Sequence, residues 1–175
     1  MPLALNLLVS LLVFASSARA ELIEARVTHI GDGDSLSVCI AGHEARVRLM
    51  YIDAPEYRQA FGKEARRSLA ELCADRVARL AWEQKDRYGR ILARVSCQDI
   101  DVNAEQVRRG MAWVSSLDKP EESFYVAQRR ARETGLGLWS DPDRIPPWEW
   151  RRAHRSQAKP AGASFPGTTV RECLP

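Results

Sequence analysis

The sequence contains few histidines, little lysine and no cysteines at metal-binding spacing. Three histidines are scattered along the 175 residues, which gives little support to a mechanism built on a histidine pair. No two cysteines stand in a C-x-x-C arrangement, so a zinc site is not expected. Lysine occurs 4 times and arginine 22 times, yet the formal net charge is only +3. Arginine binds phosphate through paired hydrogen bonds, but a modest charge does not by itself establish a nucleic-acid partner.

Only the N-terminus carries a long apolar run. Leu3–Ala15 is too short to span a bilayer comfortably, and the cleavage pattern Ala18-Arg19-Ala20 follows it. Met1-Pro2 lacks the usual basic residue, so a buried helix or an uncleaved anchor is the alternative. Because strand-like sequence starts directly after Glu21, we predict that residues 1–20 are a cleaved signal peptide. The mature chain is then expected to be periplasmic or secreted, with no segment in the membrane.

Export agrees with the cysteine content. In an oxidising compartment, four cysteines form up to two disulfides, with three possible pairings. We favour Cys73 with Cys97, because the first follows a predicted helix and the second ends a predicted strand. Cys39 would then pair with Cys173. Buried free thiols are the alternative, which is less expected outside the cytosol.

Alternating apolar residues and turn signals predict a small mixed fold. The expected strands are 23–30, 36–40, 46–52, 77–82 and 91–96. The expected helices are 57–73, a short helix capped by Asn103 with Gln106 three residues later, and a helix from about Pro120 to Gly135. This order indicates an α+β fold, a five-stranded OB-type β-barrel with three helices.

The length of the chain suits one domain. We place this domain at residues 21–140 and predict a C-terminal tail over 141–175 that contains Pro, Trp and Arg. The basic tail is either a solvated end or a segment that attracts phosphates without specificity. Trp148 and Trp150 are expected to pack on the domain rather than to stack on bases.

Four acidic residues lie near the ends of two expected strands. Asp32 and Asp34 occupy a Gly-Asp-Gly-Asp turn, and Asp53 and Glu56 follow the third strand. Each pair alone has an ordinary explanation, as a hairpin turn or as caps of the next helix. Together they form a set of hard oxygen ligands that suits Ca²⁺, although no EF-hand loop is present.

Two arginines flank this acidic group. Arg48 precedes Asp53 by five residues, which is about 16 Å between Cα atoms in an extended strand, so its side chain must reach across a curved barrel. Arg90 follows the tight turn Asp86–Gly89. Such clusters are often only salt-bridge networks. Phosphodiester cleavage needs the same parts, however: positive charge for the phosphorane and a carboxylate that takes a proton from water.

Three segments resemble the motifs of the staphylococcal nuclease family, in the family's order and at comparable spacing. They are 31–35 (GDGDS), 47–56 (VRLMYIDAPE) and 86–90 (DRYGR), and the later segments 102–103 and 135–140 are also similar. The resemblance covers about Ile23 to Ser140. Each motif is weak alone, whereas the ordered set is very specific.

This resemblance implies a calcium-dependent nuclease that acts on DNA and RNA, expels the 5′-oxygen and leaves a 3′-phosphate. Asp34 and Asp53 would be the carboxylate ligands of Ca²⁺, with the main-chain carbonyl of Ala54 as a third ligand. Glu56 would be the general base or would position the attacking water. Asp32 would shape the metal-binding turn.

The resemblance also implies how the substrate is held. Arg48 and Arg90 would bind and neutralise the scissile phosphate, and Tyr88 would hydrogen-bond one of its oxygens. DNA and RNA are the expected partners of a monomer, and no protein partner is inferred.

The chain departs from the family pattern at two places. Ala54 stands where the family usually has Thr, and a backbone ligand tolerates this change. The two tyrosines that line the nucleoside pocket are missing from 111–118. Base stacking is typically worth roughly 1–3 kcal/mol, so their absence affects the grip on substrate rather than the chemistry. Trp113 could substitute, but we expect it in the core.

Two other classes of protein remain as alternatives. A non-catalytic OB-type module would bind single strands without cutting, as degenerate repeats of this family do, but it would be expected to lose some catalytic residue types. This chain keeps all of them. A secreted structural protein with a salt-bridged barrel leaves the ordered motifs unexplained.

Overall fold

The structure, a computed structural model, describes residues 21–117, 119–154 and 172–173. The predicted signal peptide 1–20 and most of the chain beyond residue 154 lie outside these residues. Within the described part of the chain, no helix has the length and apolar character needed to cross a membrane.

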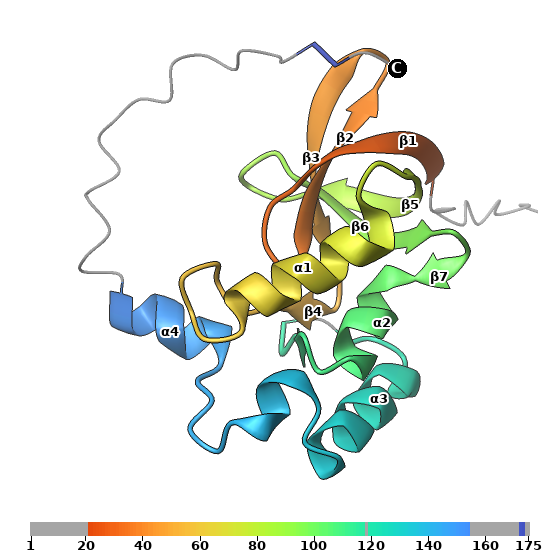
Figure 1. The fold of residues 1–175 in the computed structure, drawn as a ribbon. Helices are drawn as coiled ribbons and strands as arrows, with labels where there is room; N and C mark the ends of the chain where they lie inside the picture. Colours follow the sequence, from red (N-terminus) through yellow and green to blue (C-terminus); the bar gives the residue numbers. More distant parts are fainter. Residues whose placement is uncertain (1–20, 118, 155–171, 174–175) are drawn as a thin grey trace, which may run out of the picture.

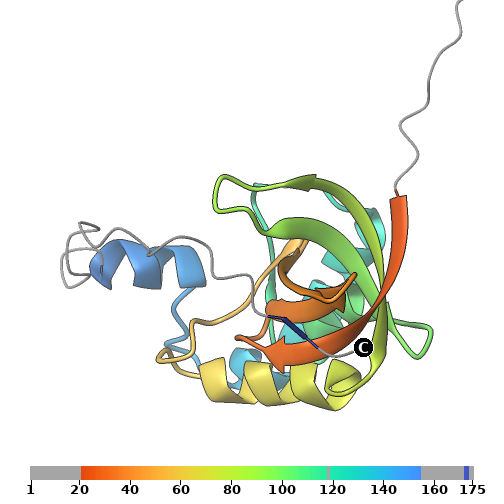
Figure 2. The same cartoon turned by 90° about the horizontal axis from the view of Figure 1, so that it is seen from above.

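Five long strands form a closed barrel (Figures 1 and 2). They are β1 (Glu21–Ile30), β2 (Ser35–Ile40), β3 (His43–Leu49), β5 (Val77–Lys85) and β6 (Ile91–Cys97). Neighbours in the order β3-β2-β1-β5-β6 pair antiparallel, and the parallel pairing of β3 with β6 closes the barrel. The predicted five-stranded OB-type barrel is therefore confirmed.

Three two-residue strands complete the sheets. β7 (Ile100–Asp101) extends β6, while β4 (Ile52–Asp53) pairs with β8 (Trp113–Val114) outside the barrel. The barrel interior follows from alternation, because successive side chains of a strand point to opposite faces. On β6 every second residue from Ile91 to Cys97 is buried.

Helices cover the ends of the barrel. They are α1 (Gly62–Cys73), α2 (Val102–Arg108), α3 (Glu122–Glu133) and α4 (Pro147–His154), with a 3₁₀ turn at Gly137–Ser140. α1 packs Ala65, Leu69 and Leu72 into the core. It begins at Gly62 and not near residue 57 as predicted, because Phe61 adopts a left-handed conformation with φ of 64°.

The start of α2 corrects the predicted cap. Asp101, not Asn103, caps the helix by accepting a hydrogen bond from the backbone N–H of Ala104. Asn103 is fully buried and donates to the carbonyls of Met50 and Ala93. Both residues are good cap types, and the choice follows from tertiary contacts, since the Asn103 amide satisfies backbone groups inside the domain.

A fourth helix, α4, occupies part of the segment predicted to be a tail. Pro147 is its first residue, a position that proline favours because its missing N–H needs no partner there. Trp148 packs against Trp113, with ring centroids 6.3 Å apart, and Trp113 packs against Trp139 at 5.4 Å. The predictions that Trp148 packs on the domain and that Trp113 lies in the core are confirmed.

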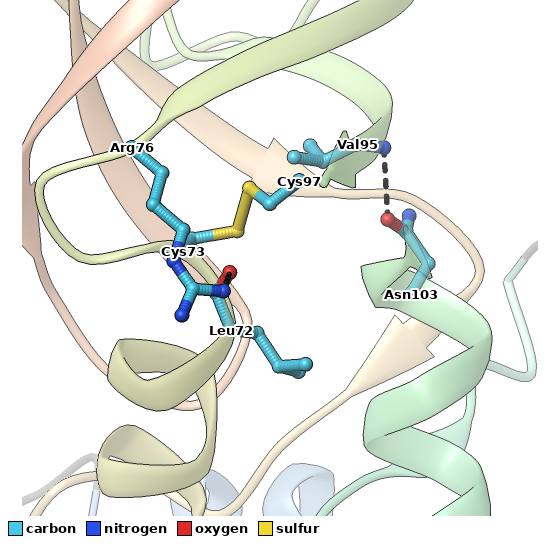
Figure 3. The surroundings of a disulfide bond; sticks show 6 residues. All are labelled: Leu72, Cys73, Arg76, Val95, Cys97 and Asn103. Carbon is cyan, nitrogen blue, oxygen red and sulfur yellow. Dashed lines mark hydrogen bonds between the residues drawn. A yellow bond between two sulfur atoms is a disulfide. The ribbon is translucent and has the colours of Figure 1, made fainter. Parts of the chain in front are cut away.

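Two disulfides join distant parts of the chain, as predicted. Cys73–Cys97 links the end of α1 to the end of β6, with 5.6 Å between Cα atoms (Figure 3). Cys39–Cys173 ties residue 173 to β2, with 5.8 Å between Cα atoms. The backbone N–H of Cys173 also donates to the carbonyl of Gly42. Both pairings are confirmed.

Candidate active site

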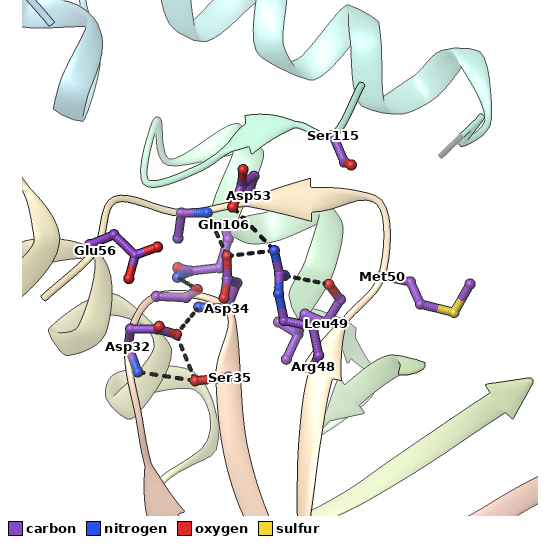
Figure 4. A network of polar contacts seen from close by, with 12 residues as sticks. Asp32, Asp34, Ser35, Arg48, Leu49, Met50, Asp53, Glu56, Gln106 and Ser115 are labelled. Atoms are coloured by element: carbon purple, nitrogen blue, oxygen red, sulfur yellow. Dashed lines mark hydrogen bonds and ion pairs between the residues drawn. The ribbon is translucent and has the colours of Figure 1, made fainter. Parts of the chain in front are cut away.

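The turn between β1 and β2 is shaped by its own side chains. One Asp32 carboxylate oxygen accepts hydrogen bonds from the backbone N–H of Asp34 at 3.2 Å and from the Ser35 hydroxyl at 2.7 Å. Asp34 then points away from the turn toward the end of β3 (Figure 4). Asp32 thus fixes the direction of Asp34 through the turn backbone.

The same turn is packed tightly against the rest of the domain. A Cβ atom on Gly33 would lie 2.6 Å from the Cβ of Ala65 and 2.7 Å from that of Ala54, so only glycine fits there. The buried side chain of Gln106 donates to the Gly33 carbonyl at 2.6 Å. This polar contact from α2 was not predicted from the sequence, because Gln106 had an alternative role in the helix cap.

The chain reverses direction after β3, and this corrects the expected geometry of Arg48. The strand ends at Leu49 rather than at Ile52, and Tyr51 adopts φ of 70°. Asp53 is thereby turned back toward β3 in the short strand β4. Arg48 therefore meets Asp53 directly and need not span the length of an extended strand.

Asp34 and Asp53 converge on one nitrogen atom. Arg48 Nη2 lies 3.1 Å from Asp34 Oδ2 and 3.2 Å from Asp53 Oδ1 (Figure 4). Both aspartates are buried, at 4% and 7% exposure. The backbone N–H of Ala54 also donates to Asp34 Oδ2, at 2.6 Å. The structure thus brings together three residues that the sequence analysis assigned to one site.

Burial and the neighbouring charges have opposing effects on the pKa of Asp34. Burial raises the pKa of Asp34 well above its usual value, while the charge of Arg48 lowers it. The charges of Asp32 and Asp53 raise the pKa further, and the hydrogen bond from Ala54 lowers it. Positive charge next to the buried carboxylates therefore favours the ionised form of Asp34.

The donor set fits a hard divalent cation. Among the described residues no three His, Cys, Asp or Glu side chains gather into a metal site. Two buried aspartates and the Ala54 carbonyl are nevertheless oxygen donors of the kind that Ca²⁺ prefers, and Ca²⁺ commonly completes its shell with water.

Glu56 lies at the solvent edge of the site. Its backbone is fixed, since the Glu56 carbonyl accepts from the N–H of Gln59 and its N–H donates to the Gln59 side chain. A Cβ on Gly62 would lie 2.0 Å from the Glu56 carbonyl oxygen. Its side chain is 36% exposed, so water can reach a carboxylate whose backbone is held in place.

Arg151 of α4 also enters the site and was not predicted. Its guanidinium contacts Asp53 Oδ2 at 2.8 Å, Asp53 Oδ1 at 3.1 Å and Glu56 Oε1 at 2.8 Å. The hydrogen bond to Asp53 is the largest cause of a raised Arg151 pKa. Arg151 follows Trp148 by three residues on one helix, and this spacing is the only sequence signal that could have placed it.

Arg90 directly precedes β6 and has its own partner. The pairing of Val47 with Ile91 puts the start of β6 beside β3, and Arg90 Nε donates to Asp86 Oδ2 at 2.7 Å. Partial burial raises the Asp86 pKa, but hydrogen bonds from the backbone and guanidinium of Arg90 outweigh it and lower the pKa. Arg90 thus pairs with Asp86, and no described contact joins it to Asp34, Asp53 or Glu56.

Tyr88 is exposed at the tip of the β5–β6 turn. Two guanidinium groups lie close to its ring, with Arg87 4.9 Å and Arg90 5.7 Å from the ring centroid. The Tyr88 side chain is therefore available to a ligand that approaches Arg90.

The fold and this site define a class of protein: a small OB-type barrel with buried carboxylates, arginines and an accessible glutamate at one end. Residues 46–141 match the family model described as "Staphylococcal nuclease homologue". The chain is similar to an "Uncharacterized endonuclease" of Haemophilus influenzae, with 40% identity over 83% of each chain. It is also 40% identical to a "Micrococcal nuclease" of Shigella flexneri, over 74% of this chain and 81% of that protein.

A third relative is "Protein ParB" of Escherichia coli, which is 40% identical over 82% of this chain and 86% of its own length. The family match over residues 46–141 includes Arg48, Asp53, Glu56 and Arg90 and begins after the turn that holds Asp34. The chain belongs to the staphylococcal nuclease family, and it is a nuclease. The family suggests that its activity depends on a metal ion.

Proposed function

We propose that this chain is a calcium-dependent nuclease that hydrolyses phosphodiester bonds of both DNA and RNA. The observation that carries this proposal is that Asp34 and Asp53 both contact the guanidinium of Arg48, with Glu56 beside them. A calcium ion bound there would supply positive charge close to the reacting phosphate.

Different residues bind the ion and activate the attacking water. Asp34, Asp53 and the Ala54 carbonyl hold the ion. Glu56 takes a proton from the attacking water, because its carboxylate is fixed at the backbone yet open to solvent.

Arginines and a tyrosine hold the phosphate. Arg48 and Arg90 neutralise the negative charge that grows on the phosphoryl oxygens, and Tyr88 hydrogen-bonds one of them. The bond from water oxygen to phosphorus forms as the bond to the 5′-oxygen breaks. The phosphate then remains on the 3′-oxygen.

The setting of the enzyme is part of the proposal. Two disulfides join cysteines that are 24 and 134 residues apart in sequence, which suits an oxidising compartment. Together with the signal peptide predicted at residues 1–20, they support a periplasmic or secreted monomer whose partners are DNA and RNA.

A non-cutting binding module is the less favoured function. Such a module needs no water-accessible carboxylate next to a buried pair of aspartates. Here the carboxylates of Glu56 and Asp53 lie close enough to contact the same guanidinium group, so an ion held by Asp53 would lie beside Glu56.

The mature chain should degrade single- and double-stranded DNA and RNA when Ca²⁺ is present. The measurement is the loss of full-length oligonucleotide on a gel, with Ca²⁺, with excess chelator, and with Ca²⁺ restored after chelation. Activity should stop with the chelator and return with Ca²⁺, because the buried aspartates lose the ion that they hold. Unchanged cleavage in the chelator would contradict calcium dependence, and intact substrate under every condition would contradict the nuclease.

A further inference from the structure

A basic cleft lies between the end of β1 and one face of α1. It has a volume of about 530 Å³, and its lining includes His29, Tyr57, Lys63, Arg66, Arg67 and Asp75. Three of these side chains are cationic at neutral pH and one is acidic. The cleft therefore attracts anions, and none of its basic residues belongs to the site described above.

The cleft borders both loops that carry the acidic residues. Ile30 lines it and leads directly into the turn that holds Asp34. Tyr57 lines it and follows Glu56 in the chain. A nucleic-acid strand with its scissile phosphate at Glu56 would therefore continue toward this cleft.

One arginine of the cleft is already positioned. Arg66 Nε donates to the Ile30 carbonyl at 3.1 Å, and its guanidinium lies 5.8 Å from the centroid of the Tyr57 ring. Tyr57 itself is 48% exposed. Tyr57 therefore offers an accessible aromatic face inside the cleft.

We propose that this cleft binds the nucleic-acid strand on one side of the cleaved bond. Lys63, Arg66 and Arg67 contact backbone phosphates, and Tyr57 stacks on a base. Phosphate contacts and sequence-tolerant stacking are the usual means of gripping a single strand. This inference rests on the proposed function, since it assigns a longer footprint to the same substrate.

The double substitution Lys63→Ala/Arg67→Ala tests the cleft and leaves the Arg66 contact to Ile30 in place. We expect the Kd for a 16-nucleotide single strand, measured by fluorescence anisotropy in chelator, to rise about tenfold. The slope of log Kd against log salt should fall by about 1.4, since each phosphate contact to a single strand contributes about 0.7. The kcat/KM for a dinucleotide should stay unchanged, because a dinucleotide does not reach the cleft.

Matched controls separate binding in the cleft from a non-specific effect of the positive charge of the protein. Arg129→Ala/Arg130→Ala removes the same charge from exposed positions of α3 and should leave the Kd unchanged. Tyr57→Phe should bind as the parent does, whereas Tyr57→Ala should bind more weakly. An equal loss of single-strand affinity in the α3 control would contradict the proposed role of the cleft. An equal loss of kcat/KM with the dinucleotide would contradict it as well. If the parent chain itself binds no nucleic acid, the proposed function fails first.

A separate observation concerns Arg151 at the acidic site. Pro147 is buried and Trp148 packs on the core, which anchors the first turn of α4. Arg151 lies one turn later and reaches both carboxylate oxygens of Asp53 and one of Glu56. Its guanidinium thus engages the groups that would bind the ion and activate water.

We infer that Arg151 closes the ion-free site and competes with Ca²⁺ for it. The positive charge of Arg151 on both oxygens of Asp53 repels a cation bound there, and the same guanidinium occupies one carboxylate oxygen of Glu56. Binding of the ion therefore releases Arg151. Because Trp150 directly precedes this arginine on α4 and Trp148 lies one turn before it, their environment should change when it is released.

Arg151→Ala should bind Ca²⁺ about threefold to tenfold more tightly than the parent, as measured by calorimetry on the full mature chain without substrate. This range corresponds to a partly exposed ion pair worth about 1 kcal/mol. Calcium should also shift the tryptophan emission of the parent, and less so that of Arg151→Ala.

Arg152→Ala is the matched control, since Arg152 is the exposed next residue of the same helix. It should leave both the affinity and the emission shift unchanged. Unchanged or weaker Ca²⁺ binding in Arg151→Ala would overturn the competition. A raised KM with unchanged Ca²⁺ affinity would instead place Arg151 on the substrate.

Discussion

Replacement of Glu56 by glutamine should slow phosphodiester cleavage by at least about 10²-fold, the scale of losing a general base. Glutamine keeps the size of the side chain and can still accept a hydrogen bond from Arg151. It cannot take a proton from water at neutral pH. The effect should therefore fall on kcat and leave the Kd for nucleic acid almost unchanged.

The measurement for this variant combines single-turnover rates in Ca²⁺ with binding in chelator. Glu64→Gln is a matched control, because Glu64 is an exposed glutamate of α1 that stands eight residues further along the chain. Its rate should equal that of the parent. Full activity of Glu56→Gln would remove Glu56 from the proposed role.

Arg48→Ala should reduce the rate by at least about 10²-fold, the scale of losing one charge-stabilising donor, and should also destabilise the fold. The two carboxylates of Asp34 and Asp53 would remain buried without their shared cation. Removing one partner of a buried ion pair costs about 3 kcal/mol or more. Calcium should restore part of the stability, because it neutralises the same carboxylates, but not the rate.

Arg90→Ala separates the two roles of Arg48. The Arg90 side chain is 31% exposed and pairs with Asp86, so its loss should cost little stability. The rate should fall by a similar factor of at least about 10². Urea unfolding with and without Ca²⁺, together with kcat/KM, measures both quantities. A rate for Arg48→Ala that recovers fully with Ca²⁺ would show that Arg48 only stabilises the aspartates.

The barrel was predictable because its signals are local. β6 alternates buried and half-buried residues from Ile91 to Cys97, and the side chains of the sequence show the same two-residue period. The disulfide between Cys73 and Cys97 followed from their positions at the ends of neighbouring elements. The predicted site residues Asp34, Arg48 and Asp53 also meet. The turn that carries Asp34 has a clear Gly-Asp-Gly-Asp signal, whereas the turn before Asp53 has none.

The errors arose where local patterns were ambiguous. Asp101 and Asn103 are both good helix caps, and the buried carbonyls of Met50 and Ala93 decided between them. The third strand was extended to Ile52, since nothing local marked the positive φ of Tyr51. The distance predicted between Arg48 and Asp53 in an extended strand was therefore too long.

The sequence by itself determined the kinds of groups available: the barrel strands, the acidic turns, the arginines and the cysteines. These are properties of neighbouring residues, so a short stretch of chain contains them. Only the tertiary structure decided that Asp34 and Asp53 share Arg48, and that Arg151 covers Asp53 from 98 residues away. The Arg151 contact depends on how α4 packs through Trp148. Such packing is set by the whole fold rather than by any local pattern.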